Sequence, residues 1–415
     1  MEKQLKNDFE KIIKKTNFSK ENILIKKDYL NKFIESGFPS RKNEDWKFSD
    51  ISQIIKKNIG ELDFYTDYET KNKIDTSIYL EKLQHNKIVF INGKIEKIDF
   101  EIEDKEKIEI LNECDFKNNF KYENSLINLN NAFNNKYYKL VVKENCSINR
   151  PLIVYQITNE ELHQNNINVR IDYKLEKNSS LKLIDFSSDR SDKNFINIFN
   201  NFELERDSVL KNYKLDKQQN NNIKYFYNNI DQKSNSVSET FILSNGSRFI
   251  KHEINCNLEG EYASAFVNGI MQLQDRQHHE IRTSINHLIN NTKSYQLIKS
   301  VLNDYSKSVY QGKIFVNSEA QKTDGYQLSK AILLNEHSEF NAKPELEIYA
   351  DDVKCSHGSA SGDLNQESIF YMMSRGLNYK EAKQLLINGF LLDVVEKITD
   401  LEIKNLIKEI MEIKE

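Results

Sequence analysis

The chain has 415 residues, with 59 Lys and Arg against 63 Asp and Glu, and a formal net charge of −4 at pH 7. A chain of this length has room for two or three ordinary domains or for one long repetitive domain. The small negative charge excludes the basic surface that is typical of nucleic-acid-binding and polybasic membrane-binding proteins. With only 12 Gly and 3 Pro, turns are expected to depend on Asn, Asp and Ser.

The cysteines are widely spaced and contain no CxxC pair, at Cys114, Cys146, Cys256 and Cys355. This spacing excludes a zinc ribbon and a disulfide framework, and it favours a reducing compartment. The N-terminal segment lacks the apolar stretch of a signal peptide, and no run approaches the roughly 18 apolar residues of a membrane helix. We therefore predict a cytoplasmic protein that binds neither membrane nor nucleic acid.

The first sixty residues have the spacing of amphipathic helices. The pattern breaks at 37–39, and a short helix is expected to start near Ser49. We predict a helical N-terminal region over residues 1–85. Its apolar faces combine Leu5, Phe9, Ile12 and Ile13 in one helix, and Tyr29, Leu30, Phe33 and Ile34 in the next.

From about Lys87 to Asp352 the apolar pattern changes to period two, in short runs such as KIVFI and KIFV that Asn, Asp or Gly separate. No amphipathic helical segment lies between these runs, which disfavours a doubly wound α/β sheet and leaves a sandwich, a barrel or a solenoid. The Asn-rich stretches 194–201 and 218–222 fit either polar loops or the stacked Asn ladders of a parallel β-helix.

After Gly362 the helical period returns. Asn378 is placed as an N-cap with Glu381 as its capping-box partner, and Asp400 can cap a last helix. We predict a compact helical domain whose apolar faces pack within the chain, with a docking surface for a partner as the alternative.

Motifs for common enzyme classes are missing from the sequence. It contains no GxGxxG, no phosphate-binding loop, no GxSxG and no HExxH. His279 and His287 would share one face of a strand and His278 the other. We interpret these histidines as groups that form hydrogen bonds across neighbouring strands, in preference to a metal site.

The most informative cluster is the CSHG motif from Cys355 to Gly358, which follows LEIYADDVK. In an extended chain, positions i and i+2 project from the same face, so the Cys355 thiolate and the His357 imidazole can point at one atom. The pair suits a soft metal or a sulfur species, with Asp351 or Asp352 as an orienting group. A structural cysteine beside a turn histidine is the alternative. Two ligands leave iron half-coordinated, so a functional pair would share its ligand with another chain.

Several segments together resemble the SufB/SufD family, the scaffold proteins of the SUF iron–sulfur cluster assembly system, and in particular its SufD members. The family commonly continues CSHG with Ala-Thr, whereas Ser359 and Ala360 stand here. The resembling segments are GFPSRKNEDWKFSDI from Gly37, QGKIFV from Gln311, AQKTDGYQ from Ala320, KPELEIYADDVKCSHG from Lys343, IFYMMSRGL from Ile369, and the helix over 382–390.

The resemblance implies a mainly β fold, in which a right-handed parallel β-helix over 86–362 lies between helical regions at 1–85 and 363–415. It implies a non-catalytic scaffold that acts with a SufB-like scaffold and with a SufC-like ABC ATPase docked on the C-terminal helical domain. His357, with Cys355 as its neighbour, would hold a transient iron–sulfur cluster at the seam with the SufB-like subunit. No cofactor is then expected to stay tightly bound to the isolated chain, and the role of Glu367 is left open.

Three alternatives remain. The chain could be a SufB-type paralogue, although its length and the ELEIYADDVKCSHG segment favour the SufD version. It could be a β-helix enzyme acting on polysaccharide, for which Asp324, Glu345 and Glu347 are candidate carboxylates. It could also form an architectural homodimer through unpaired solenoid strands when isolated.

Overall fold

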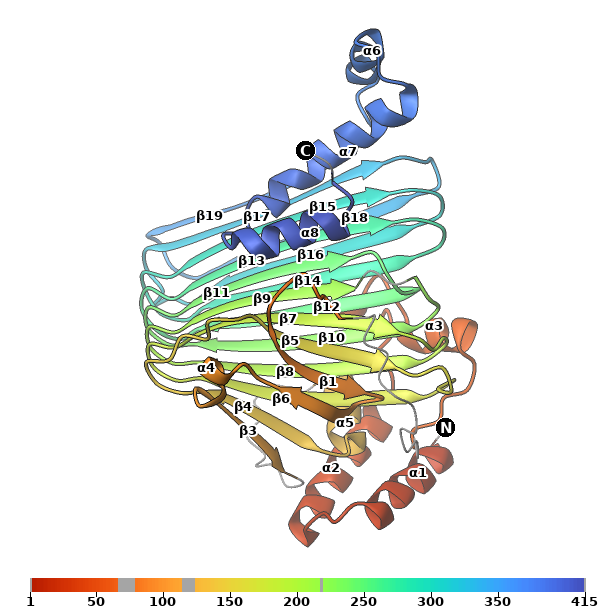
Figure 1. Ribbon diagram of the computed structural model, residues 1–415, viewed down its shortest axis with the longest axis vertical. Helices are drawn as coiled ribbons and strands as arrows, with labels where there is room; N and C mark the ends of the chain where they lie inside the picture. Colours follow the sequence, from red (N-terminus) through yellow and green to blue (C-terminus); the bar gives the residue numbers. More distant parts are fainter. Residues whose placement is uncertain (1, 66–78, 114–123, 217–218, 414–415) are drawn as a thin grey trace.

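The computed structural model describes residues 2–65, 79–113, 124–216 and 219–413, so Cys114 and the start of the 218–222 stretch lie outside the described residues. Strands dominate, and the predicted mainly β class is confirmed. The strands coil into a parallel β-solenoid made of a ten-stranded and a nine-stranded sheet, flanked by helices (Figure 1).

The helices lie before, at the start of, and after the solenoid. They are α1 (Glu2–Lys15), α2 (Lys20–Ser36), the short 3-10 helix η1 (Glu44–Trp46), α3 (Ile51–Asn58), α4 (Ile102–Lys105), α5 (Ser125–Phe133), α6 (Gln366–Ser374), α7 (Tyr379–Val395) and α8 (Leu401–Ile410). Among the described helices, none is long and apolar enough to cross a membrane.

Odd-numbered and even-numbered strands from β4 onward alternate between the two sheets. The strands are β1 (Asn86–Ile91), β2 (Lys94–Asp99), β3 (Ile108–Glu113), β4 (Tyr137–Val142), β5 (Leu152–Thr158), β6 (Asn166–Leu175), β7 (Ser180–Asp189), β8 (Phe195–Leu204), β9 (Val209–Asp216), β10 (Ile223–Gln232), β11 (Val237–Ser244), β12 (Phe249–Leu258), β13 (Ser264–Leu273), β14 (His278–His287), β15 (Lys293–Leu302), β16 (Lys307–Val316), β17 (Thr323–Leu333), β18 (Glu339–Ile348) and β19 (Val353–Gly362).

Each turn of the solenoid adds one strand to each sheet, in register with the strand before it. Ile230, Cys256 and Ile285 are successive partners in β10, β12 and β14, and all three are buried in the same core. Because side chains alternate between the two faces of a strand, every second residue points into the solenoid. The two-residue period in the sequence is this inward face.

Asn and Asp form most of the left-handed corners between the described strands, as the scarcity of glycine predicted. Asn145, Asn178, Asp207 and Asn235 all have positive φ, between 53° and 60°. Asn and Asp tolerate this left-handed conformation better than other residues with side chains. Their side chains also bond along the stack, since the Asn178 amide donates to Asn145 and the Asn235 amide donates to Asp207.

Of the two Asn-rich stretches, the first lies mainly in strand β8 and forms ladders. The Asn200 amide donates to Asn228 of β10. The Asn194 side-chain oxygen accepts from the Asn165 backbone N–H, and the Asn194 backbone N–H donates to the Asn222 side-chain oxygen. Residues 219–222 of the second stretch precede β10 as a connection. Both structures considered from the sequence are therefore present: the first stretch forms a ladder, and the described part of the second forms a loop.

The N-terminal helices and α5 cover the outer face of the nine-stranded sheet, where Phe33, Trp46 and Leu126 lie in one apolar cluster with Phe199 and Tyr225. The segment around η1 contacts strands β14 and β18, further along the solenoid. Its acidic residues pair with basic residues of that sheet, Asp45 with Arg282 and Glu44 with Lys343. The Lys251 ammonium group lies 4.2 Å from the centre of the Trp46 ring.

The C-terminal helices lie over the outer face of the ten-stranded sheet, and α6 extends beyond the end of the solenoid (Figure 1). The predicted capping box of Asn378 and Glu381 is present at α7, and Asp400 caps α8 as predicted. Val394 and Ile407 are buried against the chain itself. Other large apolar side chains remain exposed, namely Phe370, Tyr371 and Met373 on α6, and Tyr379 and Leu385 on α7.

The two ends of the solenoid differ. At the first end, antiparallel pairing of β1 with β2 and of β3 with β4 ends the parallel stack, and Phe90 packs on Tyr138 inside it. At the other end, β18 and β19 are the edge strands of their sheets, and none of their residues is fully buried. The last turn therefore exposes the inside of the solenoid.

Candidate functional site

Cys355 and His357 lie in β19, the last strand of the ten-stranded sheet. Their register partners in β17 are Gly325 and Gln327, both of which are buried. Parallel strands in register place paired side chains on the same face. Cys355 and His357 therefore share the inward face of the last turn, as their i, i+2 spacing predicted.

His357 is exposed although it occupies an inward position, because no further turn covers β19. Within the part of the chain that the structure describes, its ring has no hydrogen-bond or ion-pair partner. The imidazole is thus neither sealed in a core nor already used by a structural contact. It lies exposed at the rim of the solenoid.

Cys355 is half-buried beside the apolar cluster of Ile314 and Val316. Burial raises the pKa of the Cys355 thiol, a hydrogen bond with the backbone of Gly325 offsets part of this effect, and the charge of Asp324 adds to it. A Cβ atom at Gly325 would lie 3.4 Å from the Cys355 sulfur, in ordinary van der Waals contact, so the thiol lies directly over this position of β17. The thiol becomes a good ligand once a metal displaces its proton.

The acidic residues that precede β19 do not reach the imidazole. Asp351 and Asp352 are exposed, and the contacts of Asp352 are backbone bonds, its N–H donating to Gln321 Oε1 and its carbonyl accepting from the Lys322 N–H. Glu367 lies on α6 and is also exposed. The orienting role predicted for Asp351 and Asp352 has no contact that supports it among the described residues.

The residue of β17 that is paired in register with His357 is Gln327, which the sequence analysis did not single out. Gln327 is 1% exposed, and its Oε1 accepts from the Tyr310 hydroxyl at 3.3 Å. Its Nε2 group has no hydrogen-bond partner in the described part of the chain. A buried amide donor without a partner therefore lies one strand below the candidate ligand. The signal was the AQKTDGYQ segment, whose last residue is Gln327.

The histidines near 280 have structural roles, as interpreted from the sequence. His279 is fully buried between the Ser244 hydroxyl and the Ser247 carbonyl, each 2.8 Å from a ring nitrogen. His287 is held by the hydroxyl groups of Thr292 and Ser294. Burial lowers the pKa of His279 to about 3 and that of His287 to about 4, so both are neutral at pH 7.

Among residues 2–65, 79–113, 124–216 and 219–413, no group of three or more His, Cys, Asp or Glu side chains is arranged to hold a metal ion. Cys355 and His357 are therefore not part of such a group among the described residues. The carboxylates considered for glycoside hydrolysis also do not converge. Asp324 lies in β17 of one sheet, whereas Glu345 and Glu347 lie in β18 of the other and pair with Lys343 and Lys313.

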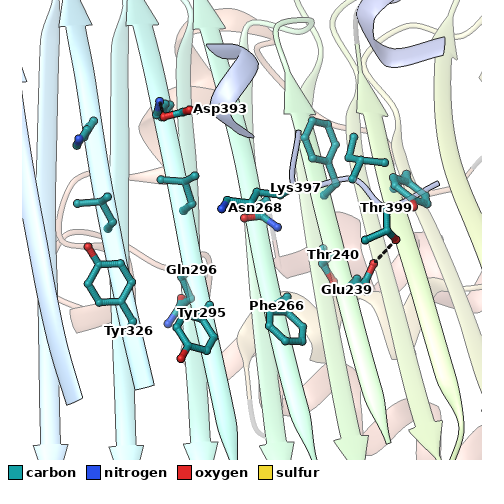
Figure 2. A pocket seen from close by; sticks show the side chains of 17 residues that line it. Glu239, Thr240, Phe266, Asn268, Tyr295, Gln296, Tyr326, Asp393, Lys397 and Thr399 are labelled. Carbon is teal, nitrogen blue, oxygen red and sulfur yellow. Dashed lines mark hydrogen bonds and ion pairs between the residues drawn. The ribbon is translucent and has the colours of Figure 1, made fainter. Parts of the chain in front are cut away.

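A groove of about 600 Å³ lies on the outer face of the ten-stranded sheet, beneath the C-terminal helices. Figure 2 shows the rings of Phe266, Tyr295 and Tyr326 in a row across neighbouring strands, with Asp393 and Thr399 on the chain that covers them. Phe266 and Tyr295 stack with centroids 6.0 Å apart. The groove separates the helices from the strands that lead to β19.

One lysine joins the two sides of this groove. Lys299 of β15 pairs with Asp393 of α7 at 2.8 Å and donates to the Phe390 carbonyl at 2.6 Å. Its ammonium group also lies 4.5 Å from the centre of the Phe390 ring. Lys299 is almost fully buried, so this is a firm attachment of α7 to the sheet.

Comparison with known proteins agrees with these features. Residues 155–390 match the SufBD core domain of the SUF system for iron–sulfur cluster assembly, which is more than half of the chain. The iron–sulfur cluster assembly protein SufD of Escherichia coli is 24% identical over 387 residues, covering 90% of this chain and 88% of that protein. The chloroplastic protein ABCI7 of Arabidopsis thaliana is 23% identical, covering 90% of this chain and 82% of that protein.

A SufBD family protein of Synechocystis shares 34% identity over 155 residues, which is 37% of this chain and 34% of that protein. The matched core domain runs from β5 to α7 and so includes the last turn of the solenoid with the CSHG motif. The chain belongs to the SufBD family of the SUF iron–sulfur cluster assembly system.

Proposed function

We propose that this chain acts as a SufD-type scaffold without catalytic activity of its own, and that it binds a SufB-like scaffold through the last turn of its solenoid. The nascent iron–sulfur cluster is the cargo of this assembly. His357 supplies one ligand to it, Cys355 is a neighbouring ligand, and the SufB-like subunit completes the coordination. The observation that carries this proposal is the exposed imidazole on the inward face of an uncovered solenoid turn, which has no partner among the described residues.

The chemistry of the pair supports a transient site. Cluster irons are usually bound by cysteine thiolates, and histidine replaces cysteine in some clusters. An imidazole at a boundary between subunits, together with a half-buried thiol whose pKa is raised, gives a site that is incomplete when the subunits are apart. An incomplete site favours release of the cluster to a recipient protein over permanent storage.

The C-terminal helices support a second contact, with a SufC-like ATPase. The exposed aromatic and apolar side chains of α6 and α7, including Phe370, Tyr371 and Tyr379, form a surface that a partner can cover. Movement of α7 would act on β15 through Lys299 and Asp393. Because β15 and β19 both pair with β17, this contact connects the helices to the candidate site.

The homodimer predicted for the isolated chain uses the same uncovered turn. The edge strands β18 and β19 offer backbone groups for pairing with a second copy. Such a dimer would cover the surface that we assign to the SufB-like subunit. Addition of that subunit is therefore expected to convert the dimer into the mixed complex.

Complementation in cells that lack their own copy tests the proposal. His357→Ala should abolish maturation of an iron–sulfur reporter enzyme while the complex still copurifies. His163→Ala is the matched control, because His163 is also exposed and lies on a distant turn, where it contacts the Asp192 carbonyl. Normal maturation with His357→Ala would contradict the proposal, as would equal loss in both variants.

A further inference from the structure

A second concave site lies on the nine-stranded sheet, whereas the groove described above lies on the ten-stranded sheet. It is a cleft of about 540 Å³ between α3, with the segment that precedes it, and the turns that lead into β12, β14 and β16. This volume is in the range of small-molecule sites. The CSHG strand does not line it, so the cleft is separate from the candidate cluster site.

Four cationic side chains line the cleft without an ion-pair partner among the described residues, namely Arg41, Lys57, Arg248 and Arg276. The carboxylates in the cleft are already used. Glu339 pairs with Lys307 at 3.0 Å, and Asp50 caps α3 by accepting from the Gln53 N–H. The cleft therefore has an excess of positive charge in a protein whose net charge is negative.

Two of the guanidinium groups are close enough to repel each other. Burial and the charge of Arg276 lower the pKa of Arg248, which is partly buried, and the charge of Asp275 opposes this shift in part. Arg276 is held over the Tyr305 ring, 5.8 Å from its centre, and Tyr305 stacks on His337. The Asp275 carboxylate offsets part of the repulsion between the two guanidinium groups, and an anion between them would relieve the rest.

A buried hydroxyl group gives a separate indication of a ligand. Ser49 lines the cleft and is 1% exposed, yet its Oγ has no hydrogen-bond partner in the described residues. Buried polar groups in folded proteins almost always have a partner. A hydroxyl can donate to an anionic oxygen, so a ligand in the cleft would satisfy Ser49.

We propose that this cleft binds a diphosphate group, either as free pyrophosphate or as part of a nucleotide. Guanidinium groups match the oxygens of phosphate in paired hydrogen bonds, and four cations without an ion-pair partner in the described part of the chain suit a ligand with several negative charges. The proposal is independent of the cluster site. Its failure would leave the role of His357 untouched.

Isothermal titration calorimetry of the full chain with pyrophosphate, ADP and citrate tests this proposal. Pyrophosphate and ADP should both release heat with saturation below about 5 mM. Equal affinities identify free diphosphate as the ligand, and a higher affinity for ADP identifies a nucleotide. Absence of binding for both, or equally strong binding of citrate, would overturn the proposal.

Variants connect the binding to these residues. Arg248→Gln and Arg276→Gln should each weaken pyrophosphate binding about tenfold or more, because each removes a charged hydrogen bond. Ser49→Ala should weaken it about threefold without lowering the thermal stability, since the hydroxyl has no partner to lose. Arg206→Gln, on an exposed turn elsewhere, is the control and should keep the wild-type affinity. Unchanged binding in both arginine variants would contradict the assignment.

Discussion

The middle of the solenoid and its last turn place the same residue types on the same inward face, with opposite results. His279 and His287 are sealed between neighbouring strands, neutral and hydrogen-bonded at both ring nitrogens. His357 occupies an equivalent inward position but is exposed, because the stack ends at β19. The comparison teaches that the covering turn, and not the residue type, decides whether an inward histidine stabilises the fold or remains available as a ligand.

The largest expected effect concerns charge in the middle of the solenoid. Lys224 is buried between Asp189 and Asp216, at 2.5 Å from Asp189. Lys224→Met would leave two buried carboxylates without compensation and should lower the free energy of unfolding by about 3–5 kcal/mol. Urea denaturation measures the change. Lys354→Met, on the exposed β19, should change the free energy of unfolding by less than about 0.5 kcal/mol. Equal effects of the two substitutions would contradict the difference between the middle of the solenoid and its last turn.

The histidines themselves provide a matched pair of substitutions. His279→Ala should lower the free energy of unfolding by about 2–3 kcal/mol, because it leaves a cavity and two polar groups without partners. His357→Ala should change the same quantity by about 0.5 kcal/mol or less. A large destabilisation by His357→Ala would mean that the ring has a structural role.

Acid should weaken the middle of the solenoid through its histidines. The folded-state pKa of His287, about 4, lies below the ordinary value of 6.5, so the unfolded state binds the proton more readily. The stability is complete above about pH 6.5 and falls between pH 6.5 and about 4, by about 2 kcal/mol at pH 5. Urea denaturation at pH 7.5 and pH 5 should show a smaller difference for His287→Gln, and an unchanged difference would contradict this explanation.

The smallest expected effect is on thiol reactivity. Cys256 is fully buried and burial raises its pKa to about 12, so it should resist iodoacetamide until the chain unfolds. Cys355 is only half-buried and should react slowly in the isolated chain. Mass spectrometry of a time course gives both rates. Binding of the SufB-like subunit should protect Cys355, and faster reaction of Cys256 than of Cys355 would reverse the comparison.

Local features of the fold could be predicted from the sequence. The Asn and Asp corners follow from the scarcity of glycine, and the Asn378–Glu381 capping box follows from spacing within one helix. The shared face of Cys355 and His357 follows from the period of an extended strand. Each of these depends on residues that are neighbours in the chain.

The remaining features depend on the register between strands that are far apart in sequence. Gln327 lies under His357, and Gly325 under Cys355, only because β17 and β19 align in this register. The contacts of Glu44 and Asp45 with Lys343 and Arg282 likewise join segments separated by more than two hundred residues. Turn lengths set such registers, and the two-residue period alone does not determine them.

The most direct test of the central claim uses a complex of this chain with the SufB-like and SufC-like proteins that we propose as its partners, loaded with iron and sulfide. With ¹⁵N-labelled histidine only in this chain, electron–nuclear double resonance of the reduced cluster should show a nitrogen coupling. The coupling should disappear in His357→Ala and persist in His163→Ala. A cluster without nitrogen coupling from this chain, or a coupling that survives His357→Ala, would contradict the account.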